Sequence, residues 1–188
     1  MHLRHELKPG DLGWVVSLHG TVYSREHGWD HTFEGYVAEG IGRFATSFDP
    51  TNERIWIAEI NQELAGCVAI VRRDHSVAQL RWFLVHIVAR GRGLGRMLLR
   101  HAIAFARSSG YQTIVLETVA GLNAAAELYR QAGFGLIRGS FCSTVGRNAK
   151  RTSIRATFVN SGRRLTCCCC WRAGNDSWTG AWKRHRKY

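Results

Sequence analysis

The sequence predicts an α/β domain in which helices flank a mixed β-sheet, and three observations predict it. An apolar strand over residues 80–88 leads through a glycine-rich turn into an amphipathic helix over residues 97–107. A second apolar strand, residues 112–118, follows that helix, and this order implies a parallel pair with a crossover. Two alternating runs, 54–60 and 63–71, predict an antiparallel hairpin that turns at Asn61-Gln62.

The remaining elements follow in chain order. Residues 1–12 are expected to be a lead-in, residues 13–19 a first strand, and residues 36–44 a helix that Gly40 and Gly42 each weaken by about 1 kcal/mol. Asp49-Pro50-Thr51-Asn52 predicts a turn. A helix is expected over 122–132, with Asn123 as its N-cap and Gly133 at its end, before a last strand over 134–138.

The turn before the central helix has the properties of an anion-binding site. Glycines allow the backbone to approach a ligand and to adopt positive φ, and the first helical turn offers unpaired N–H groups. Arginines add full positive charge, so the turn predicts a phosphate or pyrophosphate site. Its sequence fits neither the Walker pattern nor the dinucleotide fingerprint. The residues concerned are Arg90, Gly91, Arg92, Gly93, Leu94, Gly95 and Arg96.

Composition separates the chain into a body, residues 1–140, and a basic tail, residues 141–188. The chain has 188 residues and a net charge of +12, yet the body holds 15 Lys+Arg against 13 Asp+Glu. The tail holds 11 against 1, together with five of the six cysteines. No apolar run is long enough to span a membrane, and no secretory signal is visible, so a cytoplasmic protein is expected.

Two motifs in the body resemble those of the GNAT superfamily of N-acyltransferases. The first is Arg-x-x-Gly-x-Gly, formed by Arg90, Gly93 and Gly95, and the second is a Leu-Tyr pair before Gly-Phe within residues 128–134. The resemblance covers about residues 9–137, and the opening also resembles a bacterial subgroup often fused behind a MarR-type regulator. It implies the GNAT acyl-CoA N-acyltransferase fold and acetyl-CoA as the acyl donor.

The resemblance further implies roles for individual residues. An amine attacks the acetyl thioester directly, backbone N–H groups around Val85 stabilise the oxygen, and Tyr129 protonates the departing thiolate. The residues expected to contact acetyl-CoA are Leu84, Val85, Ile87, Arg90, Gly91, Arg92, Gly93, Leu94, Gly95, Arg96 and Asn123. Asn123 stands one position away from the family's asparagine, which favours its alternative role as an N-cap.

Two residues are candidates for the base that deprotonates the amine. His86 stands where the subgroup has an acid, and an imidazole titrates near neutral pH, but a purely structural role is equally open. Glu117 is the second candidate, and its alternative is a solvated charge at a strand end. His101 lies on the apolar face of the helix and is expected at the edge of the core.

The tail leaves several interpretations open. Residues 154–159 alternate as a strand does and are a candidate for a missing sheet edge. The tail is interpreted either as a polyanion-binding extension or, preferably, as a shifted reading frame. Cys167–Cys170 cannot readily close around one zinc ion, so no metal site is expected.

The expected function is transfer of acetyl from acetyl-CoA, by direct attack, to a primary amine on a small molecule or protein, with a homodimer as an open alternative. Neither a membrane nor, except through the tail, a nucleic acid is expected as a partner. The alternatives are a degenerate GNAT protein that binds acyl-CoA without turnover, and a nucleic-acid-binding protein that acts through its tail.

Overall fold

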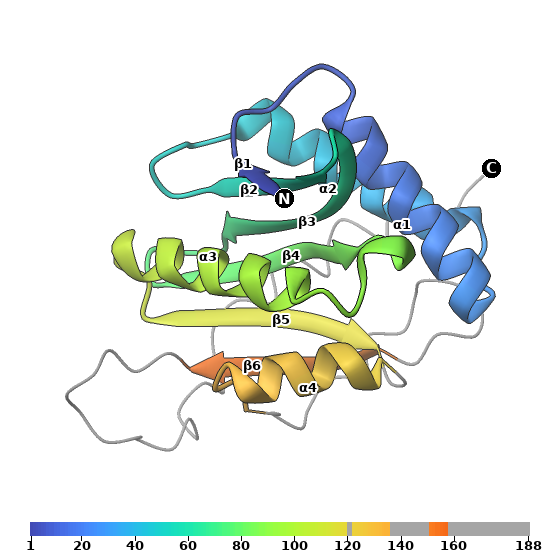
Figure 1. The fold of residues 1–188 in the computed structure, drawn as a ribbon. Coiled ribbons are helices and arrows are strands. Elements are labelled where there is room, and N and C mark those ends of the chain that lie inside the picture. Colours follow the sequence, from blue (N-terminus) through green and yellow to red (C-terminus); the bar gives the residue numbers. More distant parts are fainter. Residues whose placement is uncertain (120–121, 136–150, 158–188) are drawn as a thin grey trace, which may run out of the picture.

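A six-stranded sheet organises the molecule. The structure is a computed structural model that describes residues 1–119, 122–135 and 151–157 (Figure 1). The strands are β1 (His2–Arg4), β2 (Arg54–Ile60), β3 (Glu63–Arg72), β4 (Val77–Val85), β5 (Thr113–Val119) and β6 (Arg151–Thr157). The helices are α1 (Asp11–His27), α2 (His31–Ser47), the 3₁₀ turn η1 (Ile87–Ala89), α3 (Leu94–Ser108) and α4 (Asn123–Gln131).

The strands lie in the order β1-β2-β3-β4-β5-β6, and all neighbours are antiparallel except β4 and β5. The parallel pair β4–β5 confirms the predicted crossover through α3. The mixed sheet with helices on both faces confirms the predicted fold class.

Strand alternation divides the core between the two faces of the sheet. Trp56 and Ala58 pack with α3 and α4, which lie on the near face in Figure 1. Their neighbours Ile55 and Ile57 pack with α1 and α2 on the other face. Because successive side chains point to opposite faces, a single apolar strand serves both layers.

The hairpin β2–β3 follows the prediction closely. Asn61 and Gln62 both have positive φ, 51° and 67°, as a two-residue hairpin connection requires. The turn at Asp49 is also confirmed, since the Asn52 N–H donates to the Asp49 carbonyl over 3.1 Å.

The predicted strand over residues 13–19 is wrong, because these residues lie within helix α1. Its local composition, with Trp14, Val15 and Val16, is typical of strands, but a buried helical face decides the outcome. Gly28, with φ 66°, ends the helix. The helix predicted over residues 36–44 is confirmed as part of α2, with Gly40 and Gly42 inside it.

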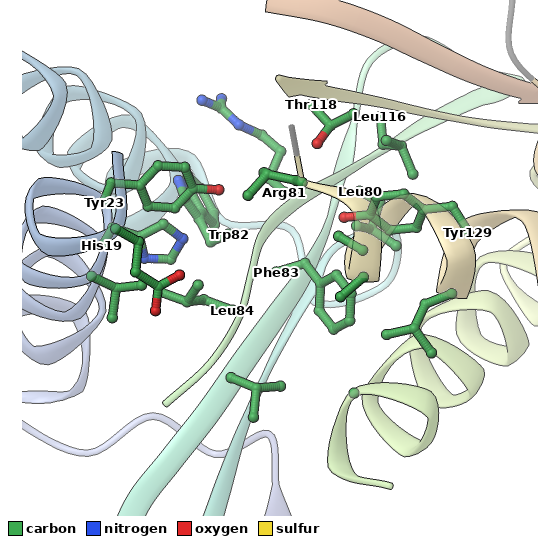
Figure 2. A pocket seen from close by; sticks show the side chains of 18 of the residues that line it. His19, Tyr23, Leu80, Arg81, Trp82, Phe83, Leu84, Leu116, Thr118 and Tyr129 are labelled. Atoms are coloured by element: carbon green, nitrogen blue, oxygen red, sulfur yellow. The ribbon is translucent and has the colours of Figure 1, made fainter. Parts of the chain in front are cut away.

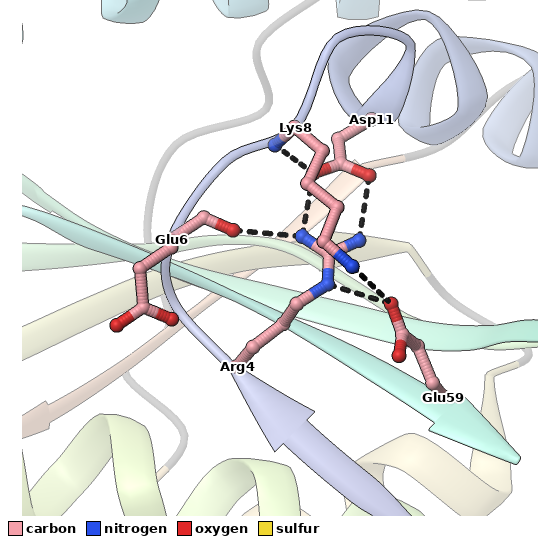
Figure 3. A network of polar contacts seen from close by, with 5 residues as sticks. All are labelled: Arg4, Glu6, Lys8, Asp11 and Glu59. Atoms are coloured by element: carbon pink, nitrogen blue, oxygen red, sulfur yellow. Dashed lines mark hydrogen bonds and ion pairs between the residues drawn. The ribbon is translucent and has the colours of Figure 1, made fainter. Parts of the chain in front are cut away.

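A buried ion-pair network fixes the beginning of α1 to the sheet edge (Figure 3). The expected lead-in contains β1, whose Arg4 is only 6% exposed. Its guanidinium donates to both carboxylate oxygens of Asp11, over 2.6 and 2.7 Å, and to Glu59 over 2.6 Å. The backbone N–H of Lys8 donates to the same Asp11 carboxylate over 2.6 Å. Burial raises the pKa of Asp11, but these hydrogen bonds outweigh it and hold the pKa below its usual value.

Several predicted boundaries are shifted. The central strand ends at Val85 rather than at residue 88, and α3 begins at Leu94. Asn123 is not the N-cap of α4: Leu122 occupies that position, without a side-chain hydrogen bond. Phe134 and Gly135 lie in no strand, and the rest of that predicted strand, 136–138, lies outside the described residues.

The tail contributes one strand to the sheet. β6 pairs antiparallel with β5, from Thr113 opposite Thr157 to Val119 opposite Arg151. The strand predicted over 154–159 is therefore present, but it begins three residues earlier, at Arg151. Residues 158–159 lie outside the described part. This part of the tail supplies the sheet edge that the body alone would lack.

Candidate active site

A β-bulge in β4 creates the opening around which the site is built. Ala69 of β3 pairs with Arg81 and Cys67 pairs with Leu84, so Val68 faces two residues, Trp82 and Phe83. Trp82 has a φ of 47°, which is unusual for a bulky residue. After the extra residue, side chains that would have pointed to one face of the sheet point to the other, because side chains alternate with a period of two residues. Before the bulge Leu80 packs with α3, whereas after it Leu84 packs with α1 and α2.

The parallel pair opens at the same place. The β4–β5 register ends at Leu80 opposite Leu116, and a cavity of about 730 Å³ lies where the strands separate. Its walls come from the glycine turn and α3 at one end, α4 and the end of β5 on one side, and α1 and α2 on the other. Figure 2 shows the two sides facing each other across β4.

The glycine turn has the conformation that the sequence predicts for an anion site. Gly91 and Gly93 have φ of 76° and 77°, and no atom lies within 4 Å of where a Cβ would stand on either residue. Gly93 is the N-cap of α3, so the free N–H groups and positive dipole end of that helix adjoin it. Gly95 serves packing instead, since its Cβ would lie 3.1 Å from Leu128 of α4. The turn fits a pyrophosphate group, because it combines unpaired N–H groups with open space.

The structure brings most of the predicted site residues to the cavity. The predicted residues that line it are Leu84, Val85, Arg90, Gly91, Gly93, Leu94, Gly95, Arg96, Glu117, Asn123 and Tyr129. Ile87, Arg92 and His86 are not among the lining residues.

Arg90 is engaged within the protein. Its Nε donates to the Val85 carbonyl over 3.2 Å, and its Nη1 lies 2.7 Å from the Glu26 carboxylate of α1. The charge of Arg90 is therefore partly compensated, and it joins the glycine turn to α1.

Tyr129 lies deep in the cavity wall. It is 5% exposed, its ring lies 5.8 Å from those of Phe83 and Phe134, and Figure 2 shows its hydroxyl directed into the cavity. Burial raises the pKa of Tyr129 well above its usual value, with a smaller contribution from Tyr23. The phenol therefore holds its proton throughout the neutral range.

His86 and His101, the two histidines considered in the sequence analysis, do not line the cavity. The backbone N–H of His86 donates to the Ala65 carbonyl of β3 over 2.8 Å. Its ring Nδ1 accepts from the backbone N–H of Val88 in η1. His101 is exposed on α3, so its expected place at the core edge is wrong.

The wall formed by α1 and α2 was missed from the sequence. It contributes a cluster of rings in which Tyr23 lies 4.6 Å from Phe33 and 5.0 Å from Trp29. Burial and the nearby Glu26 charge raise the pKa of Tyr23 to about 12. The signal was helical spacing, since Val15, Leu18, His19 and Val22 are the buried face of α1. The lining residues that were missed on this side are His19, Val22, Tyr23, Glu26, His27, Trp29, Phe33, Tyr36, Val37 and Arg81.

His19 is buried and neutral. Its Nδ1 lies 2.8 Å from the Val15 carbonyl, so this nitrogen carries the proton and Nε2 is the acceptor. Burial lowers the pKa of His19 to about 4.

Among residues 1–119, 122–135 and 151–157, no group of His, Cys, Asp and Glu is arranged to hold a metal ion. None of the helices in these same segments has the length and apolar character to cross a membrane.

An α/β sheet opened by a bulge beside an anion-binding glycine turn defines the class of fold. Residues 20–134 match the family model for the acetyltransferase (GNAT) family. The chain therefore belongs to that family, and the resemblance seen in its motifs is confirmed. The link to the MarR-associated bacterial subgroup stays a prediction.

Relatives and solved structures agree with this assignment. The chain is 36% identical to the N-acetylaspartate synthetase of Danio rerio, covering 45% of this chain and 30% of the relative. It is 33% identical to human N-acetyltransferase 8B, covering 46% and 40%. The aligned parts thus span less than half of these relatives.

Two solved structures share the fold. An acetyltransferase from Streptococcus agalactiae has a TM-score of 0.69 at 23% identity, covering 83% of this chain and 97% of that one. The spermidine N-acetyltransferase of Vibrio cholerae, in complex with CoA and spermine, has a TM-score of 0.60 at 19% identity, covering 84% and 95%.

Proposed function

We propose that this chain is an N-acetyltransferase that moves an acetyl group from acetyl-CoA to a primary amine by direct attack. The observation that carries the proposal is the cavity, which continues from the anion-binding turn past Tyr129 to the wall of α1 and α2. One end suits a pyrophosphate, and the other leaves room for an acceptor. N-acetylaspartate synthetase and spermidine N-acetyltransferase, two proteins this chain resembles, are named for compounds built on primary amines.

The residues of the chain divide the work of this reaction. Acetyl-CoA, when bound, supplies the thioester carbonyl that the amine attacks. The glycine turn holds the pyrophosphate, which makes the encounter effectively intramolecular. Beyond Leu80 the β4 backbone pairs with β3 but not with β5, so those of its N–H groups that face β5 are available to the carbonyl oxygen.

Proton transfer is assigned to Tyr129 and Glu117. Tyr129 is protonated at neutral pH and reaches the cavity, so it can donate to the departing thiolate. Glu117 lines the cavity at the end of β5, whereas His86 does not line it, so we propose Glu117 as the group that receives the proton of the amine. We also propose a cytoplasmic location, and we keep the homodimer as a prediction.

Calorimetry with acetyl-CoA tests the cofactor site first. We expect the parent chain to bind in the micromolar range, and Gly93→Glu to lose about 100-fold in affinity, or about 3 kcal/mol. The substitution puts a negative side chain at the N-terminus of α3. Gly110→Glu is the matched control, because Gly110 also has positive φ, 83°, and open space around its Cβ but lies outside the cavity.

Turnover is then measured as thiol release with a panel of primary amines. A folded parent that does not bind acetyl-CoA would contradict the proposal. Binding without turnover of any amine would instead select the degenerate acyl-CoA-binding alternative.

A further inference from the structure

Arg81 is a cation in the cavity wall that the proposed reaction does not yet use. The bulge places Arg81 and Trp82 side by side, and the Arg81 guanidinium lies 4.9 Å from the Trp82 ring and 5.9 Å from the Tyr36 ring. Figure 2 shows its side chain on the α1–α2 side of β4, across the cavity from Tyr129. The guanidinium is thus held against aromatic faces at the end of the cavity opposite the glycine turn.

A glycine in the middle of α2 makes room for this guanidinium. A Cβ at Gly40 would lie 2.9 Å from the Arg81 Nη2 and 3.3 Å from the Trp82 ring. Glycine inside a helix costs about 1 kcal/mol relative to alanine. A side chain at position 40 would therefore displace the Arg81 guanidinium and press on the Trp82 ring.

Arg81 has no carboxylate partner among the described residues. In the described part of the chain the acids that line the cavity are Glu26 and Glu117, and Glu26 is paired with Arg90. Arg4 shows the opposite case, since a less exposed arginine of this chain is paired with two carboxylates. A partly desolvated guanidinium with aromatic neighbours but no carboxylate partner is a site for an external anion, which it binds through its planar fork.

The rest of the cavity identifies that anion as a carboxylate on the acceptor. Glu117 also makes no ion pair with a described residue, so Arg81 and Glu117 are a cation and an anion that line the cavity without an ion-pair partner in the described part of the chain. An acceptor with an ammonium and a single carboxylate satisfies both charges. The rings of Tyr23, Trp29 and Phe33 contact one another in the wall of the same cavity and suit an apolar substituent.

We infer that Arg81 binds the carboxylate of an α-amino acid acceptor with an apolar side chain, whose amine is directed toward Glu117. This inference rests on the proposed acetyltransferase function. It goes beyond that function by naming the acceptor class and the residue that selects it.

Calorimetry without turnover tests this inference. The chain is saturated with CoA and titrated with L-phenylalanine and L-phenylalaninamide below pH 7, where both amines are protonated. We expect the acid to bind about tenfold or more tightly than its amide. Arg81→Gln is expected to remove the preference without changing the affinity for CoA.

Arg54→Gln is the matched control. Arg54 also lies over an aromatic ring, 4.3 Å from that of Phe105, but it does not line the cavity, so its loss should leave the preference intact. Gly40→Ala is a second variant, which displaces the guanidinium without removing it, and it should weaken binding of the acid alone.

Equal binding of acid and amide, binding of neither, or an equal loss of both in Arg81→Gln would overturn the inference. Tighter binding of O-phosphoethanolamine than of L-phenylalanine would overturn the carboxylate and favour a phosphate. Failure of the proposed function is seen separately, as absence of CoA binding in the first step. In turnover, Arg81→Gln should raise KM for the amino acid and leave kcat and the KM for acetyl-CoA unchanged.

Discussion

The two sides of β4 are built by different means. Toward α3 and α4, the site consists mainly of backbone: glycines with positive φ, a helix N-terminus and the N–H groups of an opened strand. Toward α1 and α2, it consists of side chains, with rings, Glu26 and Arg81 supplied by separate elements. The first side suits a constant part of a ligand, and the second suits a part that varies.

This difference predicts how the two sides respond to substitution. On the α3–α4 side most side chains can change without loss of acetyl-CoA affinity, provided that the glycines remain. On the α1–α2 side single side chains should decide stability and acceptor choice.

Asp11→Asn should destabilise the chain by about 3–5 kcal/mol, because it leaves the buried Arg4 guanidinium without its main partner. The network anchors α1, so the α1–α2 side should loosen first. Urea denaturation measures the loss, and Glu39→Gln, which breaks an exposed ion pair with Arg43, should cost about 0–1 kcal/mol. Equal losses in the two variants would show that the buried network does not fix α1.

The free energy of unfolding should depend on pH through the protonation of His19. Its pKa is about 4 in the folded chain and 6.5 when unfolded, so the unfolded chain takes up the proton first as the pH falls. The contribution of His19 to the free energy of unfolding is complete above pH 6.5. It decreases by about 3 kcal/mol as the pH falls toward 4.

Urea denaturation at pH 7.5, 6, 5 and 4.5 measures this slope. His19→Asn should remove it while keeping a donor near the Val15 carbonyl, and His101→Asn on the exposed face of α3 should retain it. A slope that persists in His19→Asn would show that another group is responsible.

Tyr129→Phe should lower kcat by about 100-fold and leave the KM for acetyl-CoA unchanged. It is the exception on the α3–α4 side, where a side chain and not the backbone does the chemistry. Tyr111→Phe is the matched control: burial raises the pKa of Tyr111 to about 12, and its hydroxyl donates to the Asn52 carbonyl over 2.9 Å, outside the cavity. If Tyr129→Phe keeps full kcat, another group protonates the thiolate.

The same division explains how much the sequence predicts. The glycine turn was predicted because its chemistry lies within a few consecutive residues, from Arg90 to Arg96. The β2–β3 hairpin was predicted for the same reason, since alternation and a two-residue connection are local signals.

The α1–α2 side was not predicted because its parts meet only in the folded chain. Helix α1 contains Gly13 and Gly20 as well as β-branched residues, so its propensity is low and tertiary packing determines it. Arg81 faces α1 and α2 by ordinary alternation from Leu80, but Trp82 lies beside it on the same face only because of the bulge, and no local sequence pattern predicts that bulge. The three-residue strand β1 is too short to show periodicity.

The smallest effect is expected where the two sides touch, at the ion pair between Glu26 and Arg90. Glu26→Gln should free Arg90 and raise acetyl-CoA affinity about two- to fourfold at low salt, because a partly exposed pair contributes at most about 1 kcal/mol. The gain should disappear at high salt, where such charges are screened. Glu127→Gln, which breaks an exposed pair with Arg130 on α4, should change nothing. A loss of acetyl-CoA affinity in Glu26→Gln would instead mean that the pair holds Arg90 in its binding position, and that the α1–α2 side positions part of the pyrophosphate site.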